Sequence, residues 1–104
     1  MWRLKHVLGL AKQYRQPCIV AEKDGDIYIM ANIERDRIKG ATRWIMKKIE
    51  PQRVWIFFKV AGGASVVVAL KINKKKIREQ VAYFVDKSGK ITKLGDVLDG
   101  KLRF

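Results

Sequence analysis

The feature that most constrains the fold is a pair of alternating segments on either side of two glycines, "RVWIFFKVAGGASVVVALKIN" at residues 53–73. Successive side chains of an extended chain point to opposite faces, so each segment has one apolar face. The two apolar faces share one side of a sheet only if paired residue numbers add to an even number, as in Val60 with Val66 or Phe57 with Ala69. A two-residue Gly62-Gly63 turn breaks this condition. We therefore predict a loop of three or five residues, or a β-bulge.

Two further hairpins are predicted from turn residues. Asp24-Gly25 favours a type I′ turn that pairs Lys23 with Asp26, within a hairpin over residues 18–33. The segment 81–94, "VAYFVDKSGKITKL", predicts another hairpin around residues 86–89. A helix over 74–85 is the alternative there, because several apolar residues also recur at helical spacing. These residues are Ile77, Val81, Phe84 and Val85.

Helices are predicted over residues 2–14 and 36–50, where apolar side chains recur on one stripe. The end of the chain, 95–104, is expected to form a short turn and an extended segment. The predicted order is α-β-β-α-β-β-β-β. The fold class is therefore α+β, a single domain over residues 1–104 with a mainly antiparallel sheet and two helices.

The charge balance predicts an anionic partner. The chain has 23 Lys+Arg against 10 Asp+Glu, a formal net charge of +13. Such a protein attracts nucleic acid, an anionic membrane surface or an acidic protein, although extra surface lysines also occur in thermophilic proteins. We expect no membrane partner, because the longest apolar run is too short to span a bilayer. Cys18 is the only cysteine, so we expect a buried thiol and a cytoplasmic location.

Enzymatic motifs are scarce. The sequence has no GxxxxGK[ST] or GxGxxG phosphate-binding loop and no GxSxG segment. His6 is the only histidine, and Asp24 and Asp26 flank a turn, so catalytic and metal-binding residues are not predicted. We expect a non-enzymatic protein without a cofactor. A metal-dependent nuclease is the less favoured alternative.

The second face of the segment 53–60 carries Arg53, Trp55, Phe57 and Lys59. Aromatic rings stack on bases and neighbouring cations neutralise phosphates, so we expect an exposed platform for single-stranded DNA or RNA with low sequence specificity. Two alternatives remain: the rings are buried beneath a helix, or they form the seam of a homodimer that serves as a protein-interaction module. Trp44 lies outside the apolar stripe of its helix, among cations, and is a second stacking candidate. The residues predicted to bind nucleic acid are Arg43, Trp44, Lys47, Arg53, Trp55, Phe57, Lys59 and Lys71.

Overall fold

The computed structural model describes residues 2–95 and confirms the predicted α+β class and element order. The tail predicted over 95–104 lies almost wholly outside the described residues. Helix α1 ends sooner than predicted, and a 3₁₀ turn at Arg35–Arg37 precedes α2. The elements are α1 (Trp2–Ala11), β1 (Cys18–Lys23), β2 (Asp26–Met30), α2 (Ile38–Lys48), β3 (Arg53–Lys59), β4 (Ser65–Asn73), β5 (Lys76–Val85) and β6 (Ile91–Gly95).

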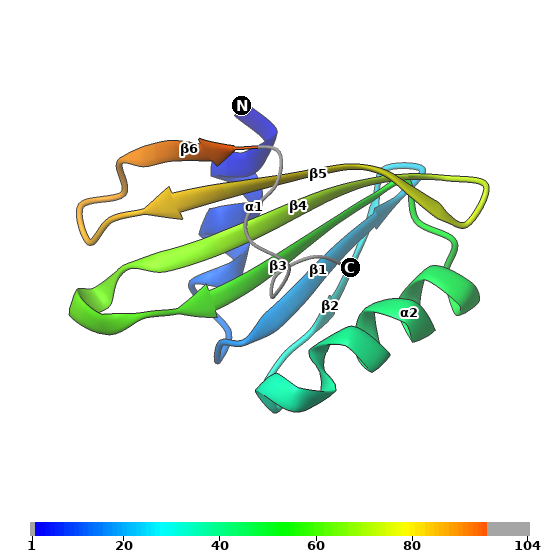
Figure 1. The fold of residues 1–104 in the computed structure, drawn as a ribbon, viewed down its shortest axis with the longest axis horizontal. Helices are drawn as coiled ribbons and strands as arrows, with labels where there is room; N and C mark the ends of the chain where they lie inside the picture. Colours follow the sequence, from blue (N-terminus) through cyan, green and yellow to red (C-terminus); the bar gives the residue numbers. More distant parts are fainter. Residues whose placement is uncertain (1, 96–104) are drawn as a thin grey trace.

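The strands form one antiparallel sheet in the order β2-β1-β3-β4-β5-β6 (Figure 1). The hairpin of β1 and β2 has the predicted register, with Lys23 opposite Asp26. The strand interpretation is confirmed over the helix alternative for 74–85: β5 starts earlier than the predicted hairpin, at Lys76, and pairs with β4 with one register shift opposite Lys71 and Ile72. Strand β3 lies inside the sheet, between β1 and β4, so both of its faces are available to covering helices.

The residue numbers paired between β3 and β4 add to an even number, as predicted. Phe57 lies opposite Val67 and Lys59 opposite Ser65, whereas the predicted register placed Phe57 opposite Ala69, two residues further along β4. Five residues, 60–64, then separate the strands, which is one of the two predicted loop lengths. The Val60 amide closes this loop by donating to the Ala64 carbonyl at 3.0 Å.

Each face of the sheet is covered by one helix, and each has its own apolar core. Helix α2 packs on the face that carries Val54, Ile56 and Phe58. Helix α1 packs on the opposite face and crosses behind the strands in Figure 1. The buried stripe of α2 contains Ile38, Thr42, Ile45 and Met46, so its other side faces outward. Within residues 2–95, neither helix has the length and apolar character needed to cross a bilayer.

Candidate nucleic-acid interface

The predicted aromatic platform is not exposed. The side chains of Trp55 and Phe57 are 4% and 0% exposed. Both belong to the core beneath α1, together with Leu4, Val7 and Leu8 of that helix. A ring in this position has no free face for a base, so the prediction that Trp55 and Phe57 stack on nucleic acid is wrong for this structure.

The physical reason is that the apolar stripe of α1 needs a partner. Trp55 and Phe57 are the largest apolar side chains on their face of the sheet, and burying them under the helix removes more apolar surface from water than leaving them exposed. Arg53 and Lys59 still reach solvent because their long side chains extend past the covered centre of β3. The helix also occupies the place that a second chain would need, so these rings do not form a dimer seam.

Arg53 and Lys71 lie opposite one another, in a row of charged residues across four strands. The row is not uniformly positive, because Glu22 lies beside Arg53 and Glu79 beside Lys71. Glu22 also forms an ion pair with Arg3 of α1. A hollow of about 90 Å³ is lined by Arg53, Lys71, Glu79 and Trp55, among others. The structure thus brings these two predicted cations together, but with carboxylates on both sides of them.

Lys59 lies at the other end of β3, roughly 20 Å from Arg53 by strand rise. It lines a groove of about 360 Å³ with Lys12, Arg15 and Lys87. The groove also contains the last turn of α1, whose carbonyl end disfavours anions. Asp86 borders it as well, and a hydrogen bond from the Ser88 hydroxyl holds the pKa of Asp86 below its ordinary value. Lys59 is therefore separate from the other predicted site residues.

The outward side of α2 carries four cations, Lys39, Arg43, Lys47 and Lys48. The helix sequence, IKGATRWIMKK, contains no acidic residue. Its cations do not lie within 4 Å of a described carboxylate, whereas the nearby Arg37 pairs with Glu34. Lys47 and Lys48 in the last turn suit the helix dipole, but Lys39 in the first turn opposes it. Helix stability alone does not explain this distribution of charge. The exposed residues are Lys39, Gly40, Arg43, Trp44, Lys47 and Lys48.

Trp44 is exposed as the sequence predicts, at 51% of its surface. Helical side chains lean toward the N-terminus, so Trp44 lies over the turn that contains Gly40. A Cβ atom built on Gly40 would meet no other atom within 4 Å. Open space thus lies beside Gly40, one turn before Trp44, and Arg43 and Lys47 occupy the adjacent row of the helix. About half of the Trp44 surface is therefore accessible to a ligand from solvent.

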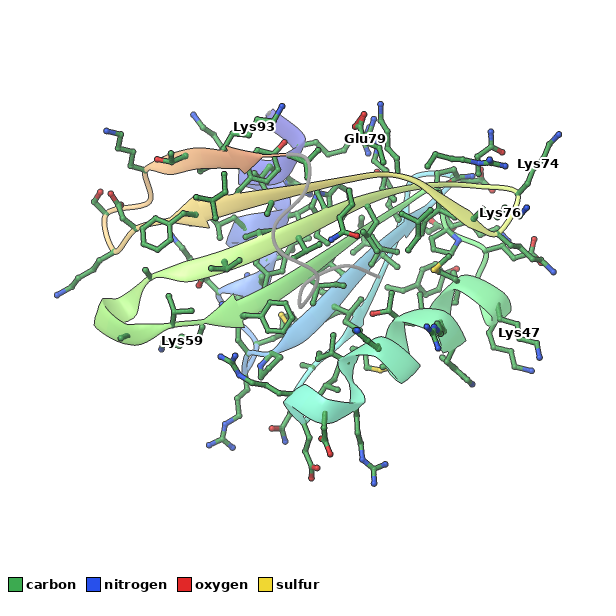
Figure 2. The ribbon with its side chains drawn as sticks, in the orientation of Figure 1. Lys47, Lys59, Lys74, Lys76, Glu79 and Lys93 are labelled. Carbon is green, nitrogen blue, oxygen red and sulfur yellow. The ribbon has the colours of Figure 1, made fainter. Side chains whose placement is uncertain are left out.

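The turn between β4 and β5 extends this surface beyond the end of α2. Lys75 forms an ion pair with Glu50, which lies just beyond the helix, at 3.4 Å. A hollow of about 390 Å³ between them is lined by Glu50, Pro51 and Asn73, among others. Figure 2 shows Lys47 and Lys74 at the same end of the molecule, with Lys59 at the opposite end. We call the residues Lys39, Arg43, Trp44, Lys47, Lys48, Lys74, Lys75 and Lys76 the helix–hairpin surface.

Carboxylates at the same end of the sheet are mostly engaged with other residues. The Asp24 carboxylate accepts a hydrogen bond from the Gln52 amide at 2.8 Å, and Glu50 pairs with Lys75. Within residues 2–95, no three His, Cys, Asp or Glu side chains are grouped in a way that could hold a metal ion. Cys18 is buried beside Phe57 beneath α1, as expected, and burial raises the pKa of its thiol to about 11.

Of the residues of the helix–hairpin surface, the sequence predicted Arg43, Trp44 and Lys47 as binding residues, and the lysines at 74–76 were expected only to form a second positive cluster near them. Their run was visible, yet its proximity to α2 depends on the packing of the sheet. Comparisons with protein-family models, curated proteins and solved structures give no match for this chain. A function must therefore be inferred from the sequence and structure of the chain itself.

Proposed function

We propose that this chain is a small, non-enzymatic nucleic-acid-binding protein that uses the helix–hairpin surface. The observation that carries the proposal is the outward side of α2, where cations without a described carboxylate partner surround a half-exposed tryptophan. Lys39, Arg43 and Lys47 follow one another at intervals of four residues, about 6 Å along the helix axis. A row of cations at this spacing can lie along a phosphate backbone, with each cation beside a separate phosphate.

The proposal assigns different roles to the two kinds of side chain. The cations neutralise phosphates and release counterions, which gives affinity without sequence specificity. Trp44 stacks on an unpaired base, and it is the residue on which a preference for single strands now depends. Sequence specificity is low, because neither contact reads the hydrogen-bonding edge of a base. A cytoplasmic location, without a cofactor or catalytic step, is part of the proposal.

The test is the binding of a fluorescein-labelled oligonucleotide, as a single strand and as a duplex, followed by anisotropy across a salt series. Log affinity should fall linearly with log salt, with a slope of about −0.7 per phosphate contact for a single strand and about −0.9 for a duplex. Arg43→Gln combined with Lys47→Gln should make the single-strand slope less negative by about 1.4.

The matched control removes the same charge elsewhere. Lys12→Gln combined with Lys90→Gln changes two exposed lysines that lie outside the helix–hairpin surface. This variant should keep the slope of the unmodified protein. Equal losses in both double variants would mean that net charge alone drives binding, and no binding at low salt would overturn the proposed function.

A further inference from the structure

The turn between β4 and β5 holds two lysines in a backbone conformation that lysine rarely adopts. Asn73 pairs with Lys76, so the turn contains only Lys74 and Lys75. Their φ angles are 52° and 63°, in the left-handed region at both positions. This is the pattern of a type I′ turn, which favours Asn-Gly or Asp-Gly because β-carbons are crowded there.

The same chain contains a second turn of this type with the favoured residues. Lys23 pairs with Asp26, and the two residues between them are Asp24 and Gly25, with φ angles of 49° and 88°. The two turns thus require the same backbone conformation, with positive φ at both central residues. One has the favoured Asp-Gly sequence and the other has Lys-Lys.

Local interactions account for only part of this difference. Lys75 pairs with Glu50, but both side chains are more than half exposed, and exposed pairs of this kind add little stability. Arg78 fixes the turn from outside by donating to the Asn73 carbonyl at 3.3 Å. Lys74 has no described partner and extends outward at the end of the hairpin in Figure 2. Its position therefore costs backbone strain without a compensating interaction within the described residues.

We infer that Lys74 and Lys75, in the turn between β4 and β5, contact backbone phosphates of the nucleic acid bound along α2. The inference rests on the proposed function and extends its footprint from the helix to the hairpin. A strand that follows Lys39, Arg43 and Lys47 leaves the helix at its C-terminal end. It then meets the hollow beside Glu50, which Lys74 and Lys75 line on the other side. Strained backbone is common where a protein binds a ligand, and we assign the strain at Lys74 and Lys75 to contact with nucleic acid.

The experiment replaces the strained pair with favoured turn residues, Lys74→Asn and Lys75→Gly. The inference predicts opposite effects on stability and binding. The melting temperature should rise, because the Asn-Gly turn removes backbone strain from the folded state. For a domain of this size we expect a rise of about 4–8 °C. Affinity for a labelled single strand at 50 mM salt should fall about eight-fold for each phosphate that is no longer neutralised, and the slope should become less negative by about 1.4.

Two controls separate the explanations. Lys74→Arg with Lys75→Arg keeps both charge and strain, so affinity and melting temperature should stay near those of the unmodified protein. Asp24→Asn changes charge in the other turn and should leave affinity within two-fold of the unmodified value, an allowance of about 0.4 kcal/mol.

Three results would overturn the inference. A lower melting temperature for the Asn-Gly variant would show that the lysines stabilise the fold. Unchanged affinity for that variant, with Arg43→Gln and Lys47→Gln still impaired, would place the interface on α2 alone and leave the proposed function standing. No binding by the unmodified protein would contradict both the proposed function and the inference about Lys74 and Lys75.

Discussion

The two tryptophans on β3 and α2 should respond oppositely to truncation. Trp55 is 4% exposed within the core beneath α1, and truncating a buried tryptophan to alanine costs about 3–5 kcal/mol. That is a large part of the roughly 5–15 kcal/mol that stabilises a typical domain. Trp44 is 51% exposed, so Trp44→Ala should change the free energy of unfolding by at most about 0.5 kcal/mol.

Binding should show the reverse order. Loss of a stacked base costs about 1–3 kcal/mol, so Trp44→Ala should lower single-strand affinity about 5- to 150-fold. Trp55→Phe keeps an aromatic ring in the core and should leave affinity unchanged. Urea denaturation followed by circular dichroism gives the stabilities, and oligonucleotide anisotropy gives the affinities. The reasoning fails if Trp55→Phe weakens binding more than Trp44→Ala does.

The remaining predictions concern charge placement and the buried thiol. Lys59→Gln should lower oligonucleotide affinity less than Lys47→Gln, because Lys59 lies in a separate groove; an equal or larger loss would place the interface there. Glu50→Gln frees Lys75 from its ion pair and should raise affinity at low salt, whereas a decrease would contradict the role given to Lys75. Burial raises the pKa of Cys18 from 9.0 to about 11, so the unfolded thiol loses its proton first and the free energy of unfolding should fall from about pH 9 toward pH 11. Cys18→Ala should remove that part of the decline, and an identical decline in this variant would exclude the thiol as its source.

Most of the fold was predictable because short-range chemistry determines it. Asp24-Gly25 specified both a turn and a register, and the structure has the predicted pairs. The even-sum condition on β3 and β4 followed from alternation alone, although the exact register shifted by two residues. Helix α2 was recognisable from its stripe of Ile38, Thr42 and Ile45, which is buried as expected.

The covering of the sheet was not predictable from the same patterns. Alternation shows that β3 has one apolar face and a second face with two aromatic rings between two cations, but it does not show which helix covers each face. Trp55 and Phe57 fit equally well in a platform or in a core, and only the placement of α1 decides between them. The left-handed conformation of Lys74 and Lys75 also could not be predicted from the sequence, because a run of lysines does not indicate a type I′ turn.

The central claim is that nucleic acid binds along α2 and the adjacent hairpin and leaves the covered sheet face untouched. Backbone amide chemical shifts of the ¹⁵N-labelled protein, recorded during titration with a short single strand, test it directly. The account predicts that the largest changes occur at residues 39–48 and 73–76, with small changes at 53–59. Large changes across 53–59 and 2–11, with α2 unaffected, would contradict it.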